Sequence, residues 1–213
     1  MHFISEELEI YIASHSQNEP ELLAALNRET HQKILQPRML SGHFQGRVLS
    51  MLSKLIGPMH VLEIGTYTGY ATLCLCEGMQ KNGLMDTIDI NEELEEIQKK
   101  YFDLSVWKNQ IQQHIGDAIE IIPTLNKKYD LVFIDADKEN YLNYFDLIVP
   151  MMNPGGIILS DNVLWSGKVL ETPDPRDLST NILLEYNKKI NQDPRVETVL
   201  LPIRDGLTVS RVL

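Results

Sequence analysis

The sequence predicts an α/β fold, a doubly wound and mostly parallel sheet with helices on both faces. Two observations carry this prediction. After residue 59, short apolar runs alternate with stretches of helical periodicity, a pattern typical of βαβ units in a parallel sheet. Near the C-terminus, Asp205 and Gly206 lie between two runs that are rich in β-branched residues. Asp-Gly in that context indicates a hairpin, so the sheet is expected to end antiparallel.

The segment before residue 58 is expected to be helical. The stretch "SEELEIYIASHS" is followed by "PELLAALNRETHQKI", in which Pro20 suits the first position of a helix. In "FQGRVLSMLSKLIG" the apolar residues are spaced for one helix face, and Gly57 followed by Pro58 ends the pattern.

The alternating part of the chain predicts strands and helices in turn. The expected strands are "HVLEI", "DTIDI", "QIQQHIG", "YDLVFID" and "GGIILSD". The expected helices between them are "GYATLCLCEGMQ", "NEELEEIQKKYFDL", "DAIEIIPTL" and "KENYLNYFDLIVPMM". Cys74 and Cys76 lie in the first of these helices, where we expect small buried hydrophobic side chains and no disulfide or zinc site. Asp205 is expected to be a turn residue, not a catalyst.

Composition narrows the class of protein. With 213 residues and no repeat or linker, residues 1–213 are expected to form one domain. A net charge of −11 argues against nucleic acid as a partner. No apolar run approaches the ~18 residues of a membrane span. The acidic start lacks the features of a signal peptide, so a cytoplasmic protein is expected.

One segment departs from this acidic character. Between Glu29 and Glu63 there is no acidic residue. The positive charges in that segment are Lys33, Arg38, Arg47 and Lys54. They are either ordinary surface charges or a local site for an anionic ligand.

A glycine-rich turn follows the first expected strand. In "HVLEIGTYTGYATL" the strand runs into Glu63, Gly65 and Gly69 before a helix, so backbone can approach a ligand closely. The spacing differs from the G-x-G-x-x-G that binds a dinucleotide pyrophosphate. The next strand ends in Asp89, which can accept both hydrogen bonds of a ribose diol, or can instead cap the following helix. The turn and the acid together favour a nucleoside ligand.

Two later strands each end in an acid, Asp135 and Asp161. Neighbouring parallel strands lie ~4.8 Å apart, so these carboxylates would converge at one edge of the sheet. Like charges that close favour a divalent cation between them, and Asn162 can add a third oxygen. Oxygen ligands favour Mg²⁺, with Ca²⁺ or Mn²⁺ as alternatives. Each aspartate could instead cap the element after its strand.

The sequence resembles class I S-adenosylmethionine-dependent methyltransferases, and more narrowly the cation-dependent O-methyltransferases of the caffeoyl-CoA and catechol type. The motifs are "PRMLSGHFQG", "VLEIGTYTGY", "TIDIN", "GDA", "FIDADK", "LSDNVLWSGKV" and "LPIRDGLTV", in the family's order over nearly the whole chain. The resemblance implies a Rossmann-like, seven-stranded methyltransferase fold. It also implies an S-adenosylmethionine donor and a homodimer.

The same resemblance implies roles for individual residues. Those matching the cofactor-binding positions are Ser41, Glu63, Gly65, Thr66, Asp89, Ala118 and Asp137. Those matching the metal ligands are Asp135, Asp161 and Asn162. Lys138 matches the lysine that removes the substrate proton, and Trp165 matches a residue that stacks on the acceptor, although it could equally anchor its own loop. Ala71 departs from the pattern, because many relatives have serine there.

These expectations combine into methyl transfer from a sulfonium to a phenolic oxygen, with the cation chelating two adjacent hydroxyls and Lys138 taking the proton. The acceptor is expected to be a catechol or a caffeoyl-CoA-like thioester, whose phosphates the basic segment could meet. One alternative is an NAD(P)-linked oxidoreductase, which the glycine spacing disfavours. Another is a noncatalytic S-adenosylmethionine-binding protein, in which Lys138 and the metal triad would have no purpose.

Overall fold

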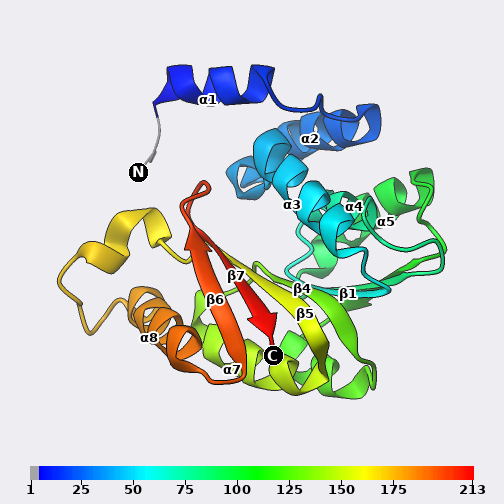
Figure 1. Cartoon of the computed structure of the whole chain (residues 1–213). Coiled ribbons are helices and arrows are strands. Elements are labelled where there is room, and N and C mark those ends of the chain that lie inside the picture. Colours follow the sequence, from blue (N-terminus) through cyan, green and yellow to red (C-terminus); the bar gives the residue numbers. More distant parts are fainter. Residues whose placement is uncertain (1–4) are drawn as a thin grey trace.

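A computed structural model describes residues 5–213, which contain one seven-stranded sheet with helices on both faces (Figure 1). The strands are β1 (His60–Ile64), β2 (Leu84–Asp89), β3 (Ile111–Ile115), β4 (Tyr129–Ile134), β5 (Met152–Asp161), β6 (Val196–Leu201) and β7 (Leu207–Val212). Their order across the sheet is β3-β2-β1-β4-β5-β7-β6. Strands β1 to β5 run parallel, and β7 is antiparallel to both β5 and β6. The predicted fold class is confirmed.

All but the last of the helices in residues 5–213 lie close to predicted segments, and the last, Leu178–Gln192, was not predicted. They are α1 (Glu6–Ser14), α2 (Glu21–Lys33), α3 (Gly42–Ile56), α4 (Tyr70–Cys76), α5 (Glu95–Leu104), α6 (Ala118–Ile121), α7 (Tyr141–Ile148) and α8 (Leu178–Gln192). Helix α2 begins one residue later than predicted, because Pro20 precedes the first helical residue. Gly57 ends α3 in the left-handed conformation that favours glycine, with φ 62°. None of the helices in residues 5–213 is long and apolar enough to cross a membrane.

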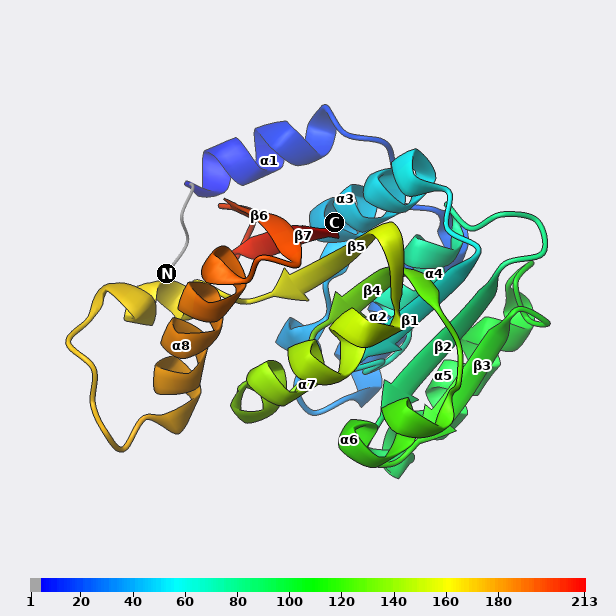
Figure 2. The same cartoon turned by 60° about the horizontal axis from the view of Figure 1, so that its bottom comes forward.

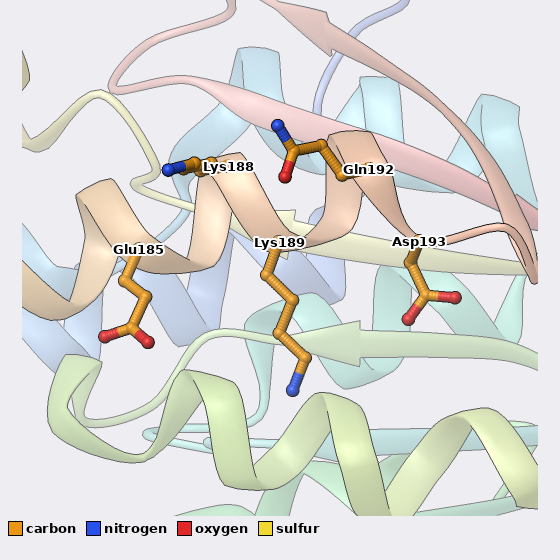
Figure 3. A pocket seen from close by; sticks show the side chains of 5 residues that line it. All are labelled: Glu185, Lys188, Lys189, Gln192 and Asp193. Atoms are coloured by element: carbon orange, nitrogen blue, oxygen red, sulfur yellow. The ribbon is translucent and has the colours of Figure 1, made fainter.

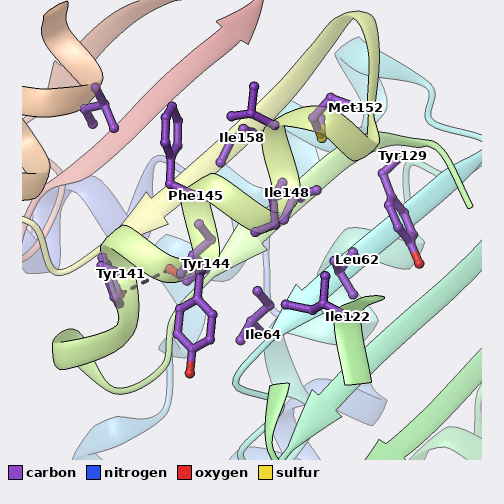
Figure 4. Close-up of a cluster of buried hydrophobic side chains, with 14 of the residues drawn as sticks. Leu62, Ile64, Ile122, Tyr129, Tyr141, Tyr144, Phe145, Ile148, Met152 and Ile158 are labelled. Carbon is purple, nitrogen blue, oxygen red and sulfur yellow. Dashed lines mark hydrogen bonds between the residues drawn. The ribbon is translucent and has the colours of Figure 1, made fainter. Parts of the chain in front are cut away.

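Helices cover both faces of the sheet (Figure 2). Each face packs its own hydrophobic cluster, because side chains alternate between faces along each strand. On one face, Leu62 and Ile64 of β1 belong to a cluster that also contains residues of helices α6, α7 and α8. Figure 4 shows this cluster, with Tyr141 and Phe145 of α7 among its members. On the other face, Val61 packs with residues of α2, α3, α4 and α5. Cys74 and Cys76 are buried there as free thiols, as predicted.

The strand order locates the crevice in which folds of this kind bind ligands. The chain first builds β1, β2 and β3 outward, then crosses back to add β4 beside β1. The order therefore reverses between β1 and β4. In open α/β sheets, ligands bind outside the carboxyl ends of the strands at this reversal. The predicted acids lie at these strand ends.

The turn between β6 and β7 holds the loop that follows β5. The carbonyl oxygen of Asp205 accepts a hydrogen bond from the amide of Leu164 at 2.8 Å. Its Oδ1 accepts from the amide of Ser166 at 2.5 Å. Gly206 has φ +90°, and a Cβ there would lie 2.5 Å from Cγ of Leu164. Asp205 is thus the predicted turn residue, and it also fixes the start of the neighbouring loop.

Candidate active site

The acids at the carboxyl edge share one face of the sheet. In the β4–β5 register, Leu131 pairs with Ile157 and Phe133 pairs with Leu159. The printed register ends at Ile134 with Ser160, and continuing it by one residue would set Asp135, just after β4, opposite Asp161, the last residue of β5. All of these alternate positions lie on the face covered by α2 to α5. The prediction that the fourth and fifth strands are parallel neighbours is therefore confirmed, and their two terminal acids point to the same side.

The turn after β1 requires glycine. Gly65 has φ +98°, and a Cβ there would lie 1.9 Å from the carbonyl oxygen of Asp135. Gly69 has φ +90°, and a Cβ there would lie 2.6 Å from the ring of Phe102. Neither position can accept a side chain without moving its neighbours. The glycines thus bring the β1–α4 turn against the end of β4, where the metal ligand is predicted.

Asp89 is held by backbone amides at the end of β2. Its Oδ2 accepts from the amide of Tyr67 at 2.6 Å, and its Oδ1 accepts from the amide of Asn91 at 2.8 Å. Burial raises the pKa of Asp89, although these hydrogen bonds act in the opposite direction. The alternative in which the side chain of Asp89 caps the next helix is wrong, because another residue is the cap. The side chain of Asn91 caps the 3₁₀ turn Glu92–Leu94 that begins this helical segment.

Glu63 is fully buried, with one carboxylate oxygen satisfied and one free. Its Oε2 accepts hydrogen bonds from the hydroxyl groups of Thr72 and, at 2.6 Å, of Thr87. Its Oε1 accepts no hydrogen bond from residues 5–213. Burial raises the pKa of Glu63 to about 8, despite these two hydroxyl donors. Because a buried polar atom without a partner is costly, Oε1 is a natural position for a ligand donor. Sequence reasoning missed both threonines.

The predicted metal ligands fit a cation. Asp161 is 2% exposed, and its Oδ1 is buried without a hydrogen-bond donor from the described part of the chain. Burial, and then the charge of Asp135, raise the pKa of Asp161 to about 7. A bound cation would remove this conflict. Asn162 follows directly, with φ 58°. No group of three or more His, Cys, Asp or Glu side chains in residues 5–213 could hold a metal, so the set of Asp135, Asp161 and Asn162 stays a prediction.

Asp161 also has a protein partner that the sequence did not predict. Gln45 of α3 is 1% exposed, and its Nε2 donates to Oδ2 of Asp161 at 2.6 Å. The Oε1 of Gln45 accepts from Nη1 of Arg204 at 2.5 Å. The sequence did contain a signal, a polar residue on the apolar face of α3, because Gln45 lies one helical turn before the buried Leu49.

Lys138 lies beside Asp135 in a buried position. Its Nζ is 3.5 Å from Oδ1 of Asp135 and donates to the hydroxyl of Tyr141 at 2.5 Å. The Tyr141 hydroxyl in turn donates to the carbonyl oxygen of Asp161 at 2.9 Å. The Nζ also lies 5.9 Å from the ring centroid of Trp165. The structure therefore brings together four predicted residues, namely Asp135, Lys138, Asp161 and Trp165. It adds Tyr141, which was not predicted from the sequence.

The remaining predicted cofactor residues lie around the same edge. Thr66 is buried in the β1–α4 turn, where its hydroxyl is 2.5 Å from that of Thr87. Ala118 begins α6 after β3, and Ser41 directly precedes α3. The carboxylate of Asp137 accepts from the hydroxyl of Tyr144 at 2.5 Å and from Asn140 at 2.7 Å. No hydrogen bond joins the side chains of these four residues to one another in the described part of the chain.

The basic segment offers little free charge. Three of its four cations form ion pairs with acids at its border or beyond it. Lys33 binds Glu29 at 2.8 Å, while Arg47 and Lys54 both bind Glu77, at 2.7 and 2.8 Å. The interpretation of this segment as an anion site is therefore not supported.

Two surface hollows flank α8. One is lined by Glu185, Lys188, Lys189, Gln192 and Asp193 (Figure 3), none of which is a predicted site residue. The other adjoins the site, because it includes Glu139, the residue after Lys138. Its other lining residues are Lys168, Asp174, Arg176, Asp177, Leu178 and Ser179. The two cations of this second hollow each bind an aspartate, Lys168 at 2.9 Å and Arg176 at 3.0 Å.

The sequence pattern of the O-methyltransferase family matches residues 13–213. The chain belongs to this O-methyltransferase family. It is 36% identical over 204 residues to caffeoyl-CoA O-methyltransferase 5 of Nicotiana tabacum, covering 91% of this chain and 85% of that protein. It is 35% identical over 220 residues to caffeoyl-CoA O-methyltransferase of Citrus natsudaidai, covering 97% and 94%. The resemblance inferred from the motifs is confirmed.

Solved structures share the fold of this O-methyltransferase. The O-methyltransferase TomG from Streptomyces achromogenes, solved in complex with SAM, has a TM-score of 0.90 and 25% identity. That match covers 98% of this chain and 99% of TomG. The O-methyltransferase from Bacillus cereus, solved with SAH, has a TM-score of 0.91 at 24% identity and covers 97% of each chain. The family assignment identifies an enzyme of the methyltransferase class and disfavours the oxidoreductase alternative.

Proposed function

We propose that this O-methyltransferase moves a methyl group from S-adenosylmethionine to a hydroxyl of a phenolic acceptor, with the help of a divalent cation. One observation carries the proposal. Asp161 ends β5 beside Asp135, with one buried oxygen lacking any donor in residues 5–213. Lys138 lies 3.5 Å from Asp135, at the same edge. Two converging carboxylates beside a buried lysine suit cation-assisted deprotonation of a hydroxyl.

The donor end of the site is assigned to the β1 and β2 strand ends. S-adenosylmethionine, when bound, supplies an electrophilic methyl group on a sulfonium cation. Asp89 can accept hydrogen bonds from its ribose hydroxyls, because carboxylate oxygens accept more than one hydrogen bond. Glu63 Oε1 is free to accept from a further donor of the ligand. The Gly65 turn lets the backbone come close, and no pyrophosphate site is needed. The complex of TomG with SAM supports this choice of donor.

The acceptor end is assigned to the β4 and β5 strand ends. Asp135, Asp161 and Asn162 would hold the cation, with Mg²⁺ favoured and Ca²⁺ or Mn²⁺ as alternatives because all three ligands are oxygens. The cation, when bound, lowers the pKa of the acceptor hydroxyl. The same ligand set orients that hydroxyl.

Lys138 is the proposed base. It is 7% exposed and is held by Tyr141 through a hydrogen bond and a ring contact of 4.5 Å. This anchoring keeps Nζ at the edge where the acceptor hydroxyl would lie, so Nζ can take the phenolic proton. Trp165 is partly buried near the same nitrogen and would cover the acceptor ring.

The acceptor is a catechol-like or a caffeoyl-CoA-like phenol; the ion pairs of this chain favour the first, whereas the relatives named above are caffeoyl-CoA O-methyltransferases. A CoA thioester carries phosphates, which need free positive charge. The cations of the hollow beside Lys138 are already bound by Asp177 and Asp174. In the basic segment, Lys33 pairs with Glu29, and Arg47 and Lys54 share Glu77, while no ion pair of Arg38 occurs in residues 5–213. The KM for a neutral catechol should depend weakly on salt concentration, whereas strong dependence with a thioester would point to the CoA-bearing acceptor.

The deciding experiment measures methyl transfer to catechols and hydroxycinnamoyl thioesters, with and without Mg²⁺. EDTA and the substitution Asp161→Ala should each abolish turnover, because the cation and its most buried ligand are removed. Asp146→Ala is the matched control, since Asp146 is 55% exposed and binds Lys189 on the surface. Turnover that survives both EDTA and Asp161→Ala would refute a cation-dependent reaction. Failure with every phenol would refute the acceptor class.

A further inference from the structure

Gln45 connects the end of β5 with the β6–β7 turn. Its amide nitrogen donates to Asp161 at 2.6 Å, and its amide oxygen accepts from Arg204 at 2.5 Å. The three residues come from α3, β5 and the hairpin turn, which are far apart in sequence. Both the nitrogen and the oxygen of the Gln45 amide are thus engaged, at a position that is 1% exposed.

Arg204 determines which way the Gln45 amide faces. A guanidinium group can only donate hydrogen bonds, and an ionised carboxylate can only accept them. Flipping the amide would place its oxygen against Asp161 and its nitrogen against Arg204, so both hydrogen bonds would be lost. Oδ2 of Asp161 is therefore occupied by a protein donor. Oδ1 remains buried and has no donor in the described part of the chain.

Arg204 also reaches the segment before α3. Its Nη1 donates to the carbonyl oxygen of Ser41 and lies 3.3 Å from that of Leu40. Ser41 is a predicted contact of the methyl donor. One guanidinium group therefore touches both the donor end of the site and, through Gln45, the cation end.

We propose that Gln45 and Arg204 are positioning residues that orient Asp161 with Oδ1 toward the cation and tie this ligand to the segment at Ser41. The inference rests on the proposed function for the presence of a cation. Hydrogen-bond partners of metal ligands fix the ligand's orientation, and their loss typically weakens metal binding about 10- to 100-fold. Neither residue is itself a metal ligand or a catalytic residue.

The test compares Gln45→Met, Arg204→Met and Arg204→Lys with the wild type. Titration calorimetry gives the dissociation constant of Mn²⁺ without donor or acceptor. A separate titration gives that of S-adenosylhomocysteine without metal. Thermal melting of the metal-free proteins reports folding. Arg211→Met is the control, because Arg211 binds Glu197 in an exposed pair.

Each variant has its own expected pattern. Gln45→Met should weaken Mn²⁺ binding about 10- to 100-fold and change S-adenosylhomocysteine binding less than about twofold, because Arg204, and not Gln45, forms the hydrogen bond to Ser41. Arg204→Met should weaken the binding of both Mn²⁺ and S-adenosylhomocysteine. Arg204→Lys keeps the charge and should recover part of both affinities. Arg211→Met should change neither.

Wild-type Mn²⁺ affinity in both Gln45→Met and Arg204→Met would overturn the proposal. If Arg204→Met lowers the melting temperature, the test rests on Gln45→Met and Arg204→Lys. Wild-type Mn²⁺ affinity in both of these variants would then overturn the proposal. Failure of the proposed function is visible separately. It would appear in the wild type itself, as methyl transfer without any Mn²⁺ or Mg²⁺ binding, whereas failure of the positioning role appears only in the variants.

Discussion

The ion pairs of Glu77 should stabilise the protein strongly above pH 5. The carboxylate binds Arg47 at 2.7 and 3.0 Å, Ser50 at 2.7 Å and Lys54 at 2.8 Å, and so joins α3 to the end of α4. Burial alone would raise the pKa of Glu77, but the hydrogen bonds from Arg47, Lys54 and Ser50 outweigh it and lower the pKa to about 2. The Glu77 side chain is 14% exposed, so water screens these contacts little.

The size of this contribution follows from the two pKa values. A fall from the ordinary 4.5 to about 2 corresponds to about 3 kcal/mol of folding free energy. Because the folded-state pKa is the lower one, the contribution is complete above pH 4.5 and is lost as the pH falls toward 2. Glu77→Gln should therefore lower the free energy of unfolding by about 3 kcal/mol at pH 7 and by much less near pH 2.

Urea unfolding of both proteins between pH 2 and pH 7 measures this difference. Glu197→Gln is the control, because the pair of Glu197 with Arg211 is exposed at both ends and should contribute under about 1 kcal/mol. A wild-type minus Glu77→Gln difference that stays constant from pH 7 to pH 2 would refute the assignment of the stabilisation to the Glu77 charge.

Three further predictions follow from the site and the core. Gly65→Ala should cost on the order of 4 kcal/mol in thermal melting, because its Cβ would lie 1.9 Å from a carbonyl oxygen; Gly42→Ala, which has a positive φ but open space, should cost about 1 kcal/mol. Equal melting of these two variants would contradict this. Tyr141→Phe should lower kcat about tenfold or more, with little change in the donor's dissociation constant, because Lys138 loses its 2.5 Å partner. An unchanged kcat would show that this contact is dispensable. Both buried cysteine thiols should resist a thiol reagent until the protein unfolds, and modification of the native protein at the rate of a free thiol would argue against their burial.

The local features of the fold could be predicted from the sequence because they depend on neighbouring residues. The strand His60–Ile64 has the predicted bounds, and the hairpin forms around Asp205 and Gly206. The convergence of Asp135 and Asp161 was also predictable, since it requires only that two parallel strands be neighbours. Short-range pattern and sheet geometry were sufficient for these points.

Contacts between distant segments were beyond such reasoning. The link from Gln45 to Arg204 joins two residues in different elements, and no periodicity relates them. The interpretation of the acid-free segment as an anion site lacked support for the same reason. Glu77, which forms ion pairs with both Arg47 and Lys54, lies outside the acid-free segment. Only the packing of α3 on α4 brings these charges together.

The position of β7 has a consequence for biosynthesis. This strand, Leu207–Val212, is inserted between β5 and β6, although the ribosome makes it after both. Until β7 has left the exit tunnel, β5 has an open edge, and Arg204, which directly precedes β7 in the chain, is kept away from Gln45. The nascent polypeptide is therefore expected to remain inactive and open to chaperones until its seventh strand is added, and a stalled chain ending before residue 204 should bind no cation tightly.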